Sequence, residues 1–188
     1  MLNYDEIKTK YGHMASWAIW TKHDKSKKAK FGVGDISFFD NPETLKLKPN
    51  VVLCGLNISK KIEQPFANFH SSSSRSHDYK VRYALENTIF SGAYMTDIIK
   101  DFEKIVSCNV TKYLRKHPEF EKDNVTSFEK ELSDIGSLNP VIICFGNDCF
   151  NIVKRNLKHK IYKVLHYSSC ITKEELRNKF EDIINDLY

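Results

Sequence analysis

The sequence has no apolar run near the ~20 residues needed to cross a bilayer, so we expect no membrane segment. Its first residues lack a basic region followed by an apolar one, which indicates no secretory signal. The five cysteines are odd in number and form no C-x-x-C pair, so neither a zinc ribbon nor a cysteine-held iron–sulfur cluster is indicated. These absences predict a reduced, cytoplasmic protein, and we expect neither a cofactor nor a bound metal.

Several signatures of nucleotide-binding and hydrolytic enzymes are also missing. Gly32-Val33-Gly34 lacks the third glycine of a dinucleotide fingerprint, and no G-x-x-x-x-G-K-[ST] segment is present. No G-x-S-x-G elbow occurs, which disfavours a serine hydrolase. A zinc site built from His70, His77 and a cysteine stays open, because its spacing is not diagnostic.

The composition is that of one globular domain that covers residues 1–188. Of the 188 residues, 41% are hydrophobic and 28% are charged, which fits a single core of ordinary size. The net charge of +5 is carried mostly by lysine, because arginine is scarce. Lysines make point-charge contacts with phosphates rather than bidentate contacts with bases, so this balance favours non-specific binding to a polyanion.

Short apolar strands alternate with segments of helical spacing. We expect strands at 51–54, 92–97, 141–145 and 162–165. We expect helices near 7–19, 78–85, 98–106, 126–135, 147–157 and 172–187, two of them starting at the capping boxes Thr126-x-x-Glu129 and Thr172-x-x-Glu175. Residues 112–124 are weakly patterned and are interpreted as a loop or a frayed helix. The pattern predicts an α/β fold: a three-layer α/β/α sandwich around a mainly parallel, doubly wound four-stranded sheet.

Three polar residues, Asn57, Asp97 and His166, stand where predicted strands end. A parallel sheet brings the carboxyl ends of its strands together at one edge, where ligands bind. With their flanking residues, these segments resemble the uracil-DNA glycosylase superfamily, of which the chain would be a divergent member. The resemblance runs from about Val51 to Ser169. Residues 1–50, an expected N-terminal helix and a basic loop, lie outside it.

The resemblance rests on several short motifs in a matching order. Gly55-Leu56-Asn57-Ile58-Ser59 is similar to the loop that positions water, which reads Gly-x-Asn-Pro-Gly in some branches. Residues 94–97 resemble the segment that reads the edge of the base, and residues 140–146 resemble the penultimate strand. His166-Tyr167-Ser168 is similar to the His-Pro-Ser loop of the family. Phe66, with Phe69 as second choice, would match the aromatic residue that stacks on the flipped base.

The resemblance implies a DNA glycosylase that flips a damaged, mismatched or modified base from DNA and hydrolyses its N-glycosidic bond. It implies that Asn57 orients the water and that His166 stabilises the departing base. Substrate binding would fall to Gly55, Leu56, Phe66, Phe69 and Asp97, and DNA binding to Ser59, Ser72, Arg75, Tyr167, Ser168 and Ser169. We expect single- or double-stranded DNA as the partner, a monomeric state and a nucleoid-associated location.

The chain departs from the family pattern at three places. Ile58 and Ser59 replace the Pro-Gly of the water-positioning loop, and Tyr167 replaces the proline of His-Pro-Ser. Asp97 stands where uracil readers have an amide. An ionised aspartate only accepts hydrogen bonds, so it suits an amino-bearing edge such as cytosine N4. We therefore expect a substrate other than simple uracil.

Structural alternatives stay open for each of these residues. Asn57 could bond only the nearby backbone, Asp97 could cap helix 98–106, and His166 could be a structural histidine. The two phenylalanines could belong to the core, and the lysine-rich segment 22–30 is either a solvated loop or an arm that follows phosphates. A catalytically inactive member of the same fold, binding nucleic acid or protein, is the alternative function.

Overall fold

The computed structural model describes residues 1–59, 61–100, 102 and 107–188. Its centre is one five-stranded sheet with the order β1-β3-β2-β4-β5. The strands are β1 (Ser16–Trp17), β2 (Lys48–Asn57), β3 (Ala93–Ile99), β4 (Val141–Phe145) and β5 (Lys160–Val164). Strands β2 to β5 pair in parallel, and β1 runs antiparallel to β3. The expected parallel sheet is thus present, but the expected number of four strands is wrong because β1 extends its edge.

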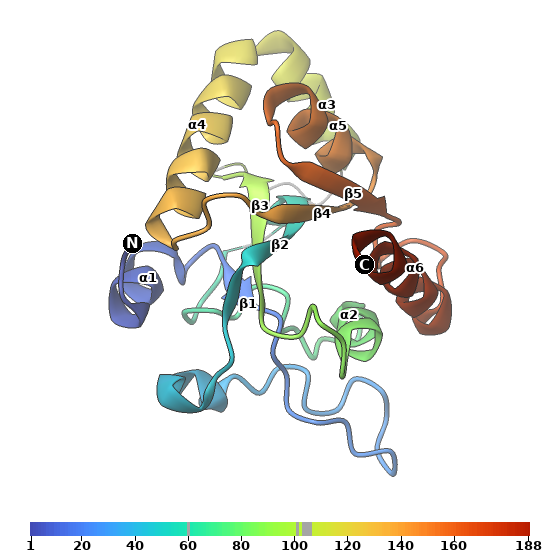
Figure 1. Cartoon of the computed structure of the whole chain (residues 1–188). Helices are drawn as coiled ribbons and strands as arrows, with labels where there is room; N and C mark the ends of the chain where they lie inside the picture. Colours follow the sequence, from blue (N-terminus) through green and yellow to red (C-terminus); the bar gives the residue numbers. More distant parts are fainter. Residues whose placement is uncertain (60, 101, 103–106) are drawn as a thin grey trace.

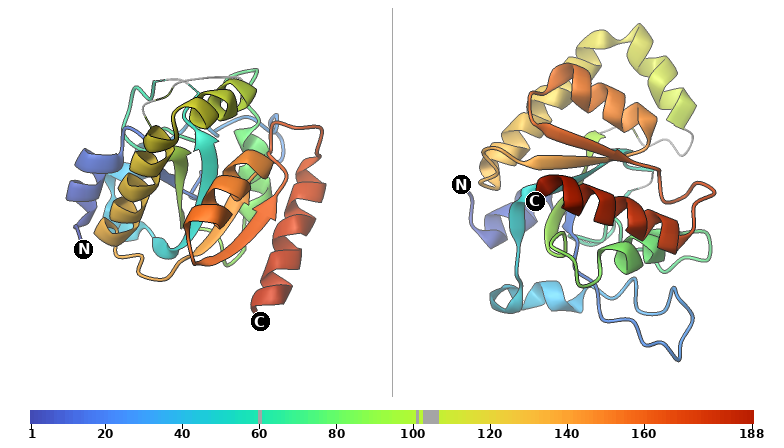
Figure 2. Two further views of the ribbon diagram at one scale, coloured as in Figure 1. Left: turned by 90° about the horizontal axis from the view of Figure 1, so that it is seen from above. Right: turned by 45° about the vertical axis from the view of Figure 1, so that its right-hand side comes forward.

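Helices cover both faces of this sheet, as Figures 1 and 2 show. One face carries α3, α4 and α5, and the other carries α2 and α6 (Figure 1). The helices are α1 (Tyr4–Tyr11), α2 (Asp78–Leu85), α3 (Ser107–Lys116), α4 (Pro118–Asp134), α5 (Asn147–Asn156) and α6 (Lys173–Leu187), with short 3-10 turns at Ser37–Asp40 and Pro42–Thr44. The arrangement is the α/β sandwich that the alternating pattern predicts.

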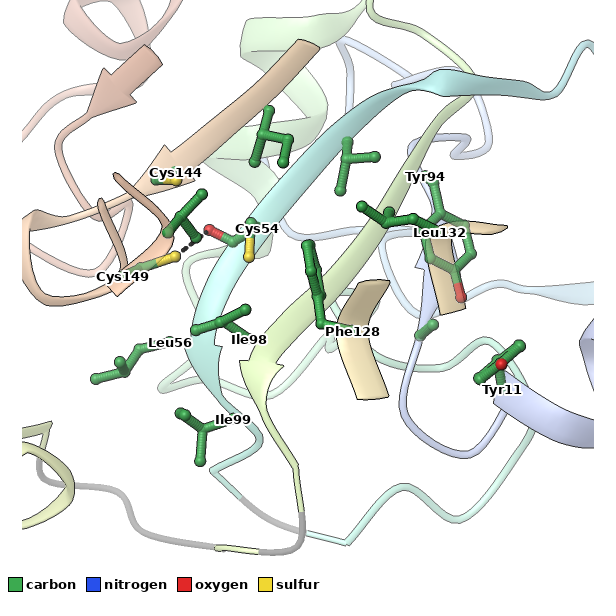
Figure 3. Packing of buried hydrophobic residues seen from close by; sticks show 14 of the residues in the cluster. Tyr11, Cys54, Leu56, Tyr94, Ile98, Ile99, Phe128, Leu132, Cys144 and Cys149 are labelled. Atoms are coloured by element: carbon green, nitrogen blue, oxygen red, sulfur yellow. Dashed lines mark hydrogen bonds between the residues drawn. The ribbon is translucent and has the colours of Figure 1, made fainter. Parts of the chain in front are cut away.

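Strand alternation sorts the apolar residues into two cores. Along β2, Val52, Cys54 and Leu56 enter the first core, against α3, α4 and α5, whereas Leu53 enters the second core, against α2 and α6. Figure 3 shows the first core, where the thiols of residues 54, 144 and 149 lie close together between β2, β4 and α5. Cys54 and Cys144 are fully buried and pack there as small hydrophobic residues.

Several expected helices begin or end elsewhere. The N-terminal helix stops at Tyr11, and Trp17 belongs to β1. No helix begins at residue 98, because Ile98 and Ile99 continue β3. Residues 101 and 103–106 of the expected helix lie outside the described residues. Residues 112–124, interpreted as a loop or a frayed helix, form the end of α3 and the first part of α4, so of these two readings the loop is wrong. The capping box at Thr126 is wrong, since Thr126 lies inside α4.

The strand order determines where a ligand site can form. Across the sheet, the four parallel strands follow the order β3-β2-β4-β5. After β3, which pairs with one side of β2, the chain crosses over β2 and places β4 on its other side. In doubly wound sheets, ligands bind outside the carboxyl ends of the strands at such a switch point. The loops that follow β2 and β4 flank this position.

Candidate functional site

The residues singled out in the sequence lie at the carboxyl ends of the parallel strands. Gly55 of β2 is in register with Asp97 of β3, and Asn57 is in register with Ile99. On the other side of β2, the backbone N–H of Gly146 donates to the carbonyl of Val164 at 2.8 Å, and His166 follows two residues later. Asn57, Asp97 and His166 therefore share one end of the sheet.

Asp97 is a buried carboxylate that lies directly over the backbone of β2. A Cβ atom placed on Gly55 would lie 2.2 Å from Asp97 Oδ1, so only glycine leaves room for the carboxylate. Burial raises the pKa of Asp97 to about 6, against the opposing effects of a hydrogen bond from Asn68 and the charge of Lys100. Asp97 does not cap a helix, because β3 continues to Ile99.

Asn68 was not singled out in the sequence, yet it is the side chain that holds Asp97. Its Nδ2 donates to Asp97 Oδ2 and to the carbonyl of Met14, both at 2.9 Å. Its Oδ1 accepts the backbone N–H of Phe69 at 3.1 Å. The one sequence signal was its place between two phenylalanines in a loop that follows the central strand.

The two phenylalanines beside Asn68 have different surroundings. Both adopt positive φ angles, 65° at Phe66 and 63° at Phe69, and their rings belong to different cores. Phe66 is fully buried in the first core, 5.7 Å from the ring of Tyr4 and 5.3 Å from that of Phe39. A stacking role for Phe66 needs an accessible ring face, and the core leaves none. Of the two, Phe69 is the one at the site.

Aromatic rings fill the space above Asp97. The end of the Phe69 ring lies 3.5 Å from the Cβ position of Gly55. Tyr167 packs on this group, with its ring centroid 5.2 Å from that of Phe145 and 6.5 Å from that of Phe69. Burial, with the nearby carboxylates of Asp78 and Asp97, raises the pKa of the Tyr167 hydroxyl well above its usual range. A base could enter here only if these rings move.

His166 is held in one neutral tautomer. The backbone N–H of Ser168 donates to His166 Nδ1 at 3.2 Å, and Ser168 Oγ lies 2.7 Å from the same nitrogen. Because a backbone N–H can only donate, Nδ1 accepts and the proton lies on Nε2. Burial and the like charge of His77 lower the pKa of His166, which favours this neutral form. Within the described residues, no hydrogen-bond partner faces Nε2–H.

The Asn57 side chain is engaged with the backbone of neighbouring loops. Its Nδ2 donates to the carbonyls of Ile58 and Phe102, both at 3.0 Å. The amide thereby ties the end of β2 to the segment that follows β3. The preceding residue, Leu56, packs its side chain into the first core, on the face of the sheet opposite to Asp97, so only its backbone faces the site.

The first turns of α2 anchor both loops that border the site. The Asp78 carboxylate accepts the backbone N–H of Ser71 at 2.7 Å. Two residues later, Lys80 Nζ donates to the carbonyls of Ser169 at 3.3 Å and Ile171 at 2.7 Å. These two loops connect β2 to α2 and β5 to α6. They expose the hydroxyl-bearing and basic residues proposed for DNA binding: Ser59, Ser72, Arg75, Ser168 and Ser169.

Two hollows of about 220 and 240 Å³ lie away from this site. Both are lined in part by Ser91, next to the amino end of β3. Across the described ranges, no group of three or more His, Cys, Asp or Glu side chains is placed to hold a metal ion. Nor does any helix in those ranges have the length and apolar character to cross a membrane.

The chain matches no protein-family model, no curated protein and no solved structure.

Proposed function

We propose that this protein is an N-glycosyl hydrolase that excises a base from DNA. The observation that carries the proposal is the set of three groups at one end of the sheet: the Asn57 amide, the buried Asp97 carboxylate and the neutral His166 imidazole. Base excision needs a group that reads the base edge, a donor for the leaving base and a positioned water. This set supplies residue types suited to all three tasks.

His166 is suited to stabilise the departing base. Negative charge develops on the base as its glycosidic bond breaks, and a fixed N–H donor aimed at a base oxygen would stabilise that charge. The Ser168 backbone holds the imidazole with its proton on Nε2, so no reorientation is needed before it donates. Protonation of Nδ1 at low pH would break the hydrogen bond from Ser168.

Asp97 is suited to read an amino-bearing base. Its pKa of about 6 leaves it mostly ionised at neutral pH, where it can only accept hydrogen bonds. The Asn68 amide fixes one carboxylate oxygen, Oδ2, and so orients the other. Exocyclic amino groups, such as N4 of cytosine and its modified forms, offer the donor that this carboxylate needs.

The direct test uses oligonucleotides with uracil, mismatched, methylated, hydroxymethylated or glucosylated bases, followed by alkaline cleavage of abasic sites. We expect strand breaks at an amino-bearing base, lost in His166→Gln and strongly reduced in Asn57→Ala. His13→Gln, at an exposed histidine after α1, is the matched control and should retain activity. Breaks that persist in His166→Gln, or that occur only at uracil, would contradict the assigned roles.

A second candidate function is binding without catalysis. It is favoured by the filled space above Asp97 and by the Asn57 amide, whose Nδ2 donates to two backbone carbonyls. For this function we expect salt-dependent binding of DNA with no strand breaks at any base. The same oligonucleotide panel separates the two functions.

A further inference from the structure

A loop outside the motifs of the family combines positive charge with an exposed aromatic ring. Segment 22–31, called here the lysine loop, contains five lysines: Lys22, Lys25, Lys27, Lys28 and Lys30. The first four are exposed. At its end, the Phe31 side chain is 59% exposed, and Lys27 Nζ lies 5.9 Å from the centre of its ring. A single exposed apolar ring is common on protein surfaces, so the feature that sets Phe31 apart is its place among the lysines.

The lysine loop is held in shape by a buried arginine. The Arg82 guanidinium, on α2, donates to the carbonyls of Ala29 at 2.6 Å and Phe31 at 2.9 Å. It also reaches the carbonyl of Thr21 at 3.5 Å, and Thr21 Oγ1 donates to Asp35 at 2.8 Å. Arg82 also lies 3.2 Å from His23 Nδ1, and the Glu86 carboxylate on α2 partly offsets its charge, so the role of Arg82 is to hold the loop backbone in place.

The lysine loop lies beside the serine-rich loop that borders the site. Lys30 Nζ donates to the carbonyl of Ser74 and lies 5.6 Å from the ring centre of Tyr79. A Cβ atom on Gly34, just after the loop, would lie 2.9 Å from Ser72 Oγ. In Figure 1 the loop after β1 projects at the lower right, below α2. A chain of phosphates could therefore run from the site across Ser72 to the lysines.

We infer that the lysine loop binds single-stranded DNA next to the target nucleotide, with Phe31 as a stacking surface for a base and the lysines as phosphate contacts. Aromatic rings set in a positively charged surface are how proteins bind single strands without sequence preference. In a duplex the bases stack on each other and offer no face to Phe31. This inference rests on the proposed action on DNA, and it specifies the form of the substrate.

The test is fluorescence anisotropy with a labelled single strand and with the matching duplex, in the His166→Gln background so that no strand is cut. We expect Phe31→Ala to weaken single-strand binding about tenfold and to leave duplex binding nearly unchanged. Lys27→Gln/Lys28→Gln should lower the slope of log K against log salt by about 1.4, since each phosphate contact contributes about 0.7 on a single strand.

Matched controls lie on other parts of the surface. Leu138→Ala removes a side chain that is 83% exposed after α4, and Lys116→Gln/Lys122→Gln removes two charges from α3 and α4. We expect neither to change single-strand affinity as much as the loop variants do. Unchanged affinity in the loop variants would overturn the inference, and so would an equal loss of affinity for the duplex.

The two proposals can fail separately. If no base is excised from any oligonucleotide but Phe31→Ala still weakens single-strand binding, the proposed role of the lysine loop is supported and the proposed hydrolase activity is contradicted. If a base is excised and both loop variants bind like the parent, the proposed hydrolase activity is supported and the lysine loop is a solvated segment.

Discussion

Two buried carboxylates lie on opposite faces of β3 and have very different partners. Glu131, from α4, is 1% exposed in the first core and pairs with Lys100 at 2.9 Å. The hydroxyls of Tyr94 and Thr96 both donate to its Oε1 at 2.8 Å. The Asp97 carboxylate, between the strand and the second core, pairs with no cation among the described residues and accepts an amide N–H from Asn68, while Lys100 Nζ donates to the backbone carbonyl of Asp97.

The difference lies in how the negative charge of each carboxylate is compensated. A buried charge that is paired and hydrogen-bonded keeps its elements in place, whereas one held by a single neutral donor stays costly to ionise. Its cost appears in the raised pKa of Asp97. Strongly perturbed groups of this kind cluster at functional sites, and Asp97 lies at the end of the sheet where a ligand is expected.

The largest effect is expected from breaking the Glu131 pair. Glu131→Leu leaves the Lys100 ammonium buried without its partner and should lower the free energy of unfolding by about 3 to 5 kcal/mol, measured by urea denaturation. The double variant Lys100→Met/Glu131→Leu removes both charges and should recover most of that loss. A double variant as unstable as the single one would show that the loss of stability comes from packing rather than from the unpaired charge.

Removing the charge of Asp97 should have the opposite sign. The folded pKa of about 6 lies above the unfolded value of 3.8, so the contribution of Asp97 to stability is present below pH 3.8 and is lost as pH rises through 6. At pH 8, Asp97→Asn should therefore be more stable than the parent by up to about 3 kcal/mol. We expect this gain to disappear near pH 4.

Urea denaturation of both proteins from pH 4 to 8 measures that difference. His70, His77 and His166 have lowered pKa values, so their contribution to stability rises with pH, opposite to that of Asp97. The difference between variant and parent removes this contribution, because both proteins contain the same histidines. A gain that does not vary with pH would show that Asp97 is not costly to ionise. Loss of base excision in the more stable variant would support a functional role for the carboxylate.

A smaller effect is expected from filling the space over β2. Gly55→Ala pushes a Cβ atom against the Asp97 carboxylate and should cost about 2 to 3 kcal/mol by urea denaturation. Gly34→Ala is the matched control, because the only atom within 3.0 Å of its Cβ would be the Ser72 hydroxyl, which can rotate away, while the His70 carbonyl and Ser72 Cβ lie farther off at 3.3 Å. If the clash is with Asp97, the cost of Gly55→Ala should fall in an Asp97→Ala background.

The smallest effect is expected from trimming the Glu131 network. Tyr94→Phe removes one of two hydroxyl donors, while Thr96 and Lys100 still satisfy the carboxylate. We expect a loss of about 1 kcal/mol in the free energy of unfolding, measured by urea denaturation. A loss as large as that of Glu131→Leu would mean that the network acts as one unit.

The sequence predicted elements whose signals are local and complete. Thr172-x-x-Glu175 correctly marked the start of α6, where both hydrogen bonds of the capping box are present. The same pattern at Thr126 was misleading, because helix-forming residues before it let α4 begin at Pro118. The helical spacing that begins at Ile98 was misleading at its start, because Ile98 and Ile99 are buried on β3, where tertiary packing overrides a periodic pattern.

Other features depended on contacts that no local pattern encodes. β1 is two residues long and exists only through its pairing with β3. The position of strand-end residues followed from the rules of parallel sheets, so Asn57, Asp97 and His166 could be placed together. The role of Asn68 could not be anticipated, because it depends on the positive φ angles of Phe66 and Phe69, which residue type alone does not reveal.

Because the first turns of α2 hold the loop after β2 through Ser71 and the loop after β5 through Ser169 and Ile171, these loops share one rigid support. Neither can swing outward alone without breaking a bond to that helix. The two loops are therefore mechanically coupled through α2, and a displacement of Tyr167 would also disturb the backbone contact at Ser71.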